Sequence, residues 1–307
     1  MKNVFIDGGA GTTGLKIMGR LRERKDLNLL SLPEELRKDT DARREAFEKA
    51  DIVFLCLPDD AAREAVGLTG SSHAVVIDTS TAHRTADGWT YGLPELKGQK
   101  EKIRSSRWIA NPGCHATGFI ALVAPLVAEG LLKEDALLSC FSLTGYSGGG
   151  KKMIAEYESP QRDALLDAPR QYGIKQAHKH LPEMQKYCGL ENAPIFCPVV
   201  ASYFAGMEVT VPLFASQLRG TAQDIRSVYE CCYAGKVIRY KEDADENGFL
   251  SAGAYSGLDS MEISVHGGKD RLLLVARFDN LGKGASGAAI QNMNLVLGLP
   301  EETGLVI

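Results

Sequence analysis

The chain has 307 residues, of which 44% are apolar and 24% are charged, and its formal net charge is −4. This composition predicts a soluble globular protein with one large or two ordinary domains. Because the chain has no excess of positive charge, we do not expect nucleic acid as a partner. No apolar run is long enough to span a bilayer, and Met1–Asp7 passes directly into a strand pattern. We therefore expect no signal peptide, no membrane contact and a cytoplasmic location.

The first 110 residues alternate between strand and helix patterns. Strands are expected at Asn3–Asp7, Leu27–Leu32, Asp51–Leu57 and Ala74–Asp78, and helices at Thr13–Arg24 and Asp59–Leu68. In the first helix, Leu15, Met18 and Leu21 are expected to share the buried face. Strands that are apolar on both faces and separated by helices predict a parallel sheet covered on both sides, which is an α/β, doubly wound, Rossmann-type dinucleotide-binding domain.

A glycine-rich loop follows the first strand and opens the first helix. Gly8, Gly11 and Gly14 form the pattern G-x-x-G-x-x-G, with Thr12 and Thr13 between the last two glycines. Such a loop allows a tight turn and lets a pyrophosphate approach the backbone at the N-terminus of a helix. The alternative is an ordinary glycine-rich turn between a strand and a helix.

The end of the second strand indicates which dinucleotide binds. An NAD site usually carries an acidic residue there, whereas this chain has Ser31 and, a few residues later, Arg37. A hydroxyl and a cation suit a 2′-phosphate, so we expect NADP. A solvated helix face explains Arg37 equally well.

Cys114 is the candidate nucleophile. The apolar stretch Trp108–Ala110 ends at the turn signal Asn-Pro-Gly, Cys114 follows at once, and Phe119–Glu129 is compatible with a helix. The N-terminus of a helix favours a thiolate, which is the nucleophilic form of cysteine. Combined with a nucleotide loop, this thiol predicts a dehydrogenase that works through a covalent thioester. An inert buried thiol is the alternative.

The other cysteines carry no comparable signal. No pair has C-x-x-C spacing, so we expect free thiols in a reducing compartment and no metal site. Adjacent Cys231 and Cys232 lie on a helical pattern and are expected to face the core. The seven cysteines are Cys56, Cys114, Cys140, Cys188, Cys197, Cys231 and Cys232.

A thioester dehydrogenase also needs an acid/base, for which histidine is well suited. His178 and His180 lie together in a cationic stretch bounded by proline. Either of them alone could instead be a surface residue. His115 adjoins Cys114 in sequence, so we expect it on a different side of the helix start.

Longer strand patterns follow the cysteine and predict a second, α+β domain with a mostly antiparallel sheet. They are Leu137–Thr144, Val199–Leu218, Met261–His266 and Arg271–Asp279. The helical tail Ala285–Leu299 is expected to pack back on the first domain. The predicted division is a nucleotide-binding domain of residues 1–114 plus 281–307, and a catalytic and oligomerisation domain of residues 115–280.

Taken together, these motifs resemble those of the N-acetyl-γ-glutamyl-phosphate reductases, in the shorter of that family's two types, over essentially the whole chain. The related aspartate-β-semialdehyde dehydrogenases typically carry a glutamine soon after the cysteine, where this chain has His115-Ala116-Thr117. The matching segments are Gly8–Gly14, Asp78–Arg84, Tyr91–Glu95, Asn111–Cys114, His178–Glu183 and Lys283–Asn292.

The resemblance implies NADPH-dependent reduction of N-acetyl-γ-glutamyl phosphate to N-acetylglutamate 5-semialdehyde, with release of phosphate, in arginine biosynthesis. It implies a homo-oligomer, either a dimer or a tetramer. Cys114 would be the nucleophile and either His178 or His180 the acid/base, with His180 preferred. The implied cofactor-binding residues are Gly8, Gly11, Thr12, Thr13, Gly14, Ser80, Gly284 and Asn292, and the implied substrate-binding residues are Arg84, Asn111 and Glu183.

Several alternatives stay open at this point. Lys151 and Lys152 stand where the longer type has an arginine, so an anion-binding role for them is undecided. The substrate could be an aspartate-type or aminoadipate-type semialdehyde. A protein of another class, a non-catalytic NADP-binding redox sensor, would use Cys114 but would need no acid/base. A cysteine hydrolase would leave the glycine loop unexplained.

Overall fold

The computed structural model describes residues 1–70 and 72–307. These residues form two compact units. The first comprises Met1–Pro112 and Ala285–Leu305, and the second comprises Gly113–Gly284 and Val306–Ile307. Among the helices in these residues, none has the length and apolar character that crossing a membrane requires.

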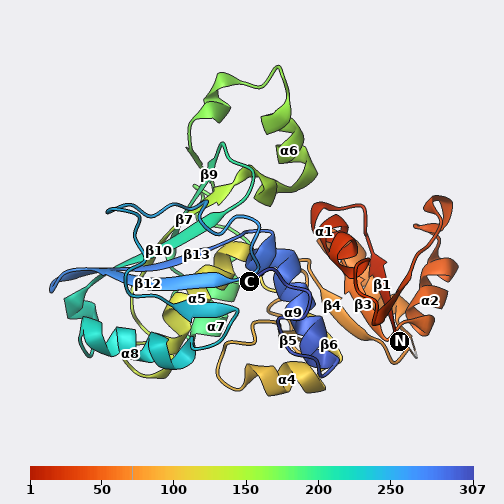
Figure 1. Cartoon of the computed structure of the whole chain (residues 1–307), viewed down its shortest axis with the longest axis horizontal. Coiled ribbons are helices and arrows are strands. Elements are labelled where there is room, and N and C mark those ends of the chain that lie inside the picture. Colours follow the sequence, from red (N-terminus) through yellow and green to blue (C-terminus); the bar gives the residue numbers. More distant parts are fainter. Residues whose placement is uncertain (71) are drawn as a thin grey trace. The chain divides into compact units, whose positions relative to one another are not determined.

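The described part of the first unit contains a six-stranded sheet in which every neighbouring pair of strands is parallel (Figure 1). The order across the sheet is β2-β1-β3-β4-β6-β5, and the predicted doubly wound fold is confirmed. The strands are β1 (Lys2–Asp7), β2 (Leu27–Leu30), β3 (Ile52–Leu55), β4 (Val75–Asp78), β5 (Thr90–Tyr91) and β6 (Trp108–Ala110).

Helices cover both faces of this sheet. On β1, Val4 and Ile6 pack into one apolar cluster with residues of α1, α4 and α9, whereas Phe5 packs into another with residues of α2 and α3. Alternate side chains of a strand point to opposite faces, which explains the two clusters. The helices are α1 (Thr12–Leu21), α2 (Thr40–Lys49), α3 (Asp59–Leu68), α4 (Gln99–Ser105) and α9 (Gly287–Val296), with a 3₁₀ turn at Glu34–Leu36.

The predicted buried face of α1 is wrong for Leu15, which is 51% exposed. The residues that α1 buries are Gly14, Ile17 and Leu21. A Cβ on Gly14 would lie 2.9 Å from the carbonyl oxygen of Gly8, so the helix packs on the glycine loop through Gly14. That contact sets the rotation of the helix and turns Leu15 outward.

The described strands of the second unit form a seven-stranded sheet in the order β11-β12-β13-β10-β7-β9-β8. Most neighbouring pairs are antiparallel, as predicted, but β7–β9 and β11–β12 are parallel. The predicted segment Val199–Leu218 is in fact two strands separated by a turn. The strands are β7 (Ser139–Gly145), β8 (Arg170–Gln171), β9 (Ile195–Ala201), β10 (Met207–Phe214), β11 (Ile238–Tyr240), β12 (Met261–Gly267) and β13 (Arg271–Phe278).

One face of this sheet is covered by helices, among them α5, which packs against β10 and β13 (Figure 1). Gly118 allows this close packing, since a Cβ there would lie 2.6 Å from a methyl carbon of Val209. The helices are α5 (Cys114–Ala128), α6 (Gly150–Glu158), α7 (Leu181–Cys188) and α8 (Ala222–Cys232), with 3₁₀ turns at Tyr146–Gly149, Ala164–Asp167 and Ala215–Gln217 and a π-helical turn at Gly282–Ser286.

The expectation that Cys231 and Cys232 face the core is wrong, because both are exposed. The residues that α8 buries are Ile225 and Tyr229, one turn apart. Tyr229 also donates its hydroxyl to the carbonyl of Leu122 in α5 at 2.5 Å, which fixes the side of α8 that faces inward.

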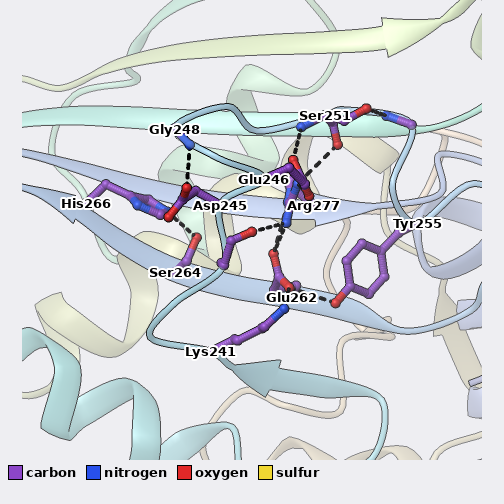
Figure 2. A network of polar contacts seen from close by, with 12 residues as sticks. Lys241, Asp245, Glu246, Gly248, Ser251, Tyr255, Glu262, Ser264, His266 and Arg277 are labelled. Carbon is purple, nitrogen blue, oxygen red and sulfur yellow. Dashed lines mark hydrogen bonds and ion pairs between the residues drawn. The ribbon is translucent and has the colours of Figure 1, made fainter.

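A buried ionic network ties a loop to the opposite face of the sheet (Figure 2). Arg277 on β13 donates to Glu262 on β12 at 2.9 and 2.6 Å, and to Glu246 in the loop at 2.5 Å. The hydroxyl of Tyr255 donates to the other oxygen of Glu262 at 2.8 Å. Buried charges are tolerated when hydrogen bonds satisfy them, so this network anchors the loop between β11 and β12.

Candidate active site

Cys114 is the first residue of α5 and is half-buried, and Gly113 is the N-cap residue. The first-turn N–H groups of a helix and its dipole stabilise a negative charge at this position. Gly284, in the π-helical turn, packs directly against it, because a Cβ there would lie 2.8 Å from the Cβ of Cys114. The sulfur therefore occupies a confined place at the start of the helix.

Glu183 connects the cysteine loop to the histidine segment. It lies in the first turn of α7, is buried, and its carboxylate accepts a hydrogen bond from the Gly113 N–H at 3.0 Å. α5 and α7 pack against each other. Glu183 is predicted to bind substrate, and its contact with the backbone beside Cys114 also gives it a positioning role.

Three histidines gather at the start of α5. The ring of His115 lies 5.9 Å from that of His178 and 5.3 Å from that of His180, measured between centroids. The backbone N–H of His180 donates to Nδ1 of His178 at 3.3 Å. Burial, and then the nearby charge of Lys179, lower the pKa of His178 below its usual value. The two predicted acid/base candidates thus share one cluster with the residue after the nucleophile.

His115 is buried and bonded at both ring nitrogens. Nδ1 lies 2.6 Å from the hydroxyl of Ser142 on β7, and Nε2 lies 2.7 Å from the hydroxyl of Tyr172, just after β8. Burial, followed by the charges of His178 and Lys179, lowers the pKa of His115 to about 3. The ring is therefore neutral at physiological pH.

The sequence did not identify Ser142 or Tyr172 as site residues. Neither lies in a motif with the cysteine, and only the pairing of β7 and β8 with β9 brings them to the start of α5. The sequence did contain one indication, since Tyr172 stands only six residues before His178.

In the first unit, the glycine loop adopts the geometry that a dinucleotide needs. Gly8 has φ of +82°, and a Cβ there would lie 2.4 Å from the carbonyl oxygen of Cys56 at the end of β3. Gly11 is the N-cap residue of α1, so Thr12, Thr13 and Gly14 form its first turn. The loop lies between the carboxyl ends of β1 and β3, where the strand order reverses, and ligands of open α/β sheets bind at such a point.

Ser80 belongs to a hydrogen-bonded cluster beyond the end of β4. The buried carboxylate of Asp78 accepts from the Ser80 hydroxyl at 2.7 Å and lies 2.6 Å from Nδ1 of His83. The ring of His83 stacks on Trp89, with centroids 4.1 Å apart. This cluster gives the loop after β4 a fixed conformation.

Arg84, Asn111 and Asn292 lie together in the first unit. Arg84 is buried and donates to the carbonyls of Asn111 at 3.0 Å and Thr79 at 3.2 Å. Asn292 on α9 donates to the side-chain oxygen of Asn111 at 3.3 Å and to the Gly92 carbonyl at 2.9 Å. The Arg84 contacts support the segment that leads to Cys114, and substrate binding by Arg84 and Asn111 stays a prediction.

The remaining predicted residues are exposed. Ser31 follows β2 directly, and Arg37 forms a 3.9 Å surface ion pair with Glu34. Lys151 and Lys152 lie on the exposed surface of α6. Among residues 1–70 and 72–307, no group of three or more histidine, cysteine or acidic side chains is arranged to hold a metal ion.

Comparison with known proteins matches both units to one family. Residues 3–106 match the semialdehyde dehydrogenase NAD binding domain, and residues 114–280 match the semialdehyde dehydrogenase dimerisation domain. Among solved structures, aspartate semialdehyde dehydrogenase II from Vibrio cholerae is similar with a TM-score of 0.74, covering 97% of this chain and 98% of that chain. At 18% identity, this likeness concerns the fold alone.

Curated relatives are much closer in sequence. N-acetyl-γ-glutamyl-phosphate reductase 2 of Nostoc sp. is 44% identical, covering 98% of this chain and 98% of its own length. N-acetyl-γ-glutamyl-phosphate reductase of Brucella anthropi is 48% identical, covering 96% of this chain and 98% of its own length. These matches confirm the resemblance seen in the motifs. The chain is a member of the semialdehyde dehydrogenase family and, within it, of the N-acetyl-γ-glutamyl-phosphate reductases.

Proposed function

We propose that this chain catalyses the NADPH-dependent reduction of N-acetyl-γ-glutamyl phosphate to N-acetylglutamate 5-semialdehyde, with release of phosphate, as a step of arginine biosynthesis. The observation that carries the proposal is the position of Cys114 at the first turn of α5, in one cluster with His115, His178 and His180. The names of the curated relatives support the choice of substrate.

The covalent chemistry belongs to Cys114. Its thiolate attacks the acyl carbon, the bond from that carbon to the phosphate oxygen breaks, and phosphate leaves with the electron pair. The resulting thioester keeps the acyl group at the start of α5. Reduction of the thioester leaves an oxyanion, which the acid/base residue protonates to give a thiohemiacetal. The same residue then takes that hydroxyl proton back, the carbon–sulfur bond breaks, and the aldehyde departs as the thiolate is restored.

We assign the acid/base to His180. Protonation of His178 at Nδ1 would break its hydrogen bond with the backbone N–H of His180, so that bond keeps His178 neutral. His178 then orients the segment that carries both histidines, and His180 exchanges the proton with the reacting acyl group. The test is replacement of each by asparagine. His180→Asn should lower kcat by about 10²-fold or more, and His178→Asn should lower it less. The reverse order would refute the assignment.

The first unit fits NADP. Gly8, Gly11, Thr12, Thr13 and Gly14 would hold the pyrophosphate at the N-terminus of α1. The tight turn depends on the glycines, because a Cβ at Gly8 or Gly14 would collide with neighbouring backbone. When bound, the cofactor supplies the hydride that reduces the thioester.

Other cofactor contacts are proposed for residues outside the glycine loop. The exposed pair Ser31 and Arg37 would contact the 2′-phosphate. Ser80 and Gly284 would each contact the cofactor, as the family resemblance implies. Oδ1 of Asn292 is buried and has no hydrogen-bond partner among the described residues, so it suits a donor such as the nicotinamide amide.

An assay in the oxidative direction tests the proposed function. The purified chain is given phosphate, NADP and one of three aldehydes: N-acetylglutamate semialdehyde, aspartate semialdehyde or an aminoadipate semialdehyde. The expected result is NADPH formation with the first substrate, dependent on phosphate. Preference for another aldehyde would replace the proposed substrate, and cofactor binding without turnover would favour the redox-sensor alternative.

We also propose that the chain forms a homodimer or a tetramer built from two such dimers, in a reducing, cytoplasmic compartment that fits its free thiols. The matched dimerisation domain supports this, as does an apolar patch on the sheet face away from α5. There, Phe141 on β7 and Leu273 on β13 are 53% and 42% exposed. The double variant Phe141→Glu, Leu273→Glu should be monomeric in analytical ultracentrifugation, whereas Leu165→Glu, at an exposed site on another segment, should leave the mass unchanged.

A further inference from the structure

Three hydrogen-bonding side chains form a chain within the histidine cluster at the start of α5. Ser142 on β7 contacts Nδ1 of His115 at 2.6 Å, and Nε2 of His115 contacts the hydroxyl of Tyr172 at 2.7 Å. His115 adjoins Cys114 in the first turn of α5. The hydrogen-bond chain therefore runs from buried Ser142 to Tyr172, whose ring lies 5.8 Å from that of His178 between centroids.

Because His115 is neutral, one ring nitrogen donates and the other accepts, and this leaves two arrangements. In the first, Ser142 donates to Nδ1, Nε2–H donates to the oxygen of Tyr172, and the phenol proton points onward. In the second, every direction is reversed, and the hydroxyl proton of Ser142 is left over.

Ser142 and Tyr172, at the two ends of the hydrogen-bond chain, differ in burial, and this difference favours the first arrangement. Ser142 is 1% exposed, and His115 is the one hydrogen-bond partner that its hydroxyl has among the described residues. An unsatisfied buried donor costs free energy, so the second arrangement is unfavourable. Tyr172 is half-buried, so it is less enclosed than Ser142.

The phenol also interacts electrostatically with Cys114. The pKa of Tyr172 is raised, first by burial and then by negative charge on Cys114. The other titratable groups near the cluster are His178 and His180 before α7, Lys179 between them, and Glu183, which bonds to the Gly113 N–H. Among these, a phenol O–H directed by a neutral histidine supplies a donor without adding a charge.

We propose that Ser142, His115 and Tyr172 form a directed hydrogen-bond chain that presents the phenol O–H of Tyr172 to the thiolate of Cys114. In this proposal the hydroxyl of Tyr172 would donate to the reacting sulfur, while His115 and Ser142 are positioning residues. The inference rests on the proposed function only in taking Cys114 as the nucleophile. The measurements below use no substrate, so the two can fail separately.

The tautomer of His115 tests the direction of the hydrogen-bond chain in the unmodified protein. Nitrogen-15 chemical shifts of labelled histidines distinguish the two tautomers, and the His115 signals are identified as those missing from His115→Gln. The expected result is a neutral ring with the proton on Nε2. A proton on Nδ1 at neutral pH would overturn the proposal, whether or not the enzyme reduces the acyl phosphate.

Alkylation of the Cys114 sulfur tests whether the hydrogen-bond chain reaches that atom. Iodoacetamide is added at a series of pH values, and modification of the Cys114 peptide is followed by mass spectrometry. Tyr172→Phe should make this modification about tenfold slower at neutral pH, because a hydrogen bond to a charged group is lost. The matched control Tyr146→Phe removes a hydroxyl that contacts surface Glu158 and should behave as the wild type. Equal rates in Tyr172→Phe and the wild type would refute the proposal.

Discussion

The carboxylate of Glu183 accepts a hydrogen bond from the backbone N–H of Gly113, the residue directly before the nucleophile, at 3.0 Å. Seventy residues separate the two positions in the chain. One buried contact thus joins the segment that carries the histidines to the turn that carries Cys114.

Replacement of Glu183 tests this contact. Glu183→Ala leaves the Gly113 N–H without its acceptor in a buried place, and a hydrogen bond to a charged group contributes about 1.5–3 kcal/mol. We expect a lower melting temperature and a fall in kcat larger than any change in the KM for the acyl phosphate. Glu183→Gln keeps an acceptor oxygen and should recover most of the loss. If Glu183 acts only by binding substrate, KM will rise in both variants while the melting temperature stays constant.

Gly284 packs closely against Cys114, so we expect that adding one methyl group at position 284 will lower both stability and activity. In Gly284→Ala the new Cβ would meet the Cβ of Cys114 at 2.8 Å, and overpacking of this kind typically costs about 1–3 kcal/mol. Turnover should fall along with the melting temperature. Gly19→Ala is the control, since a Cβ there meets nothing within 4 Å and alanine favours the helix. Full activity in Gly284→Ala would contradict the described packing.

The buried His115 predicts acid sensitivity. Its pKa in the folded state is about 3, whereas the unfolded chain titrates near 6.5. Between these values the unfolded state binds a proton that the folded state does not, so the free energy of unfolding falls as the pH drops below about 6.5, by at most about 1.4 kcal/mol per pH unit. His178, whose pKa is also lowered, acts in the same direction. Urea unfolding of the wild type and His115→Gln at about pH 7 and about pH 5 checks this. The variant should lose less stability on acidification, and equal losses would contradict the described burial.

Arg37 provides a test of cofactor choice. If its guanidinium contacts the 2′-phosphate, Arg37→Ala should raise the KM for NADPH about tenfold and leave that for NADH unchanged. Arg44→Ala removes another exposed cation, paired with Asp41 on α2, and serves as the control. Equal changes for both cofactors in Arg37→Ala would argue for a structural role.

The parts of this protein that the sequence predicts well are those in which a local pattern determines the structure. The apolar strand and glycine loop at Gly8, and the turn before Cys114, are local signals of this kind. Leu15 was misassigned because its helix is rotated by the packing of Gly14 on the loop, a tertiary contact. The sequence pattern does not predict the helix around Arg43, because that helix is strongly polar and one of its three buried residues, Arg43, is charged.

The polar environment of the site was the least predictable part. Tyr172 and Ser142 reach His115 only through strand pairing between distant segments, and no spacing in the chain encodes that pairing. The expectation for Cys231 and Cys232 failed for a related reason, since the facing side of α8 is set by Tyr229 bonding to α5.

The most direct test of the central claim is detection of the thioester. The protein is mixed with N-acetyl-γ-glutamyl phosphate in the absence of NADPH, quenched in acid, and digested for mass spectrometry. We expect one N-acetylglutamyl group, attached at Cys114, and no adduct in Cys114→Ala. An adduct on another cysteine, or turnover by Cys114→Ala at the rate of the wild type, would contradict the central claim.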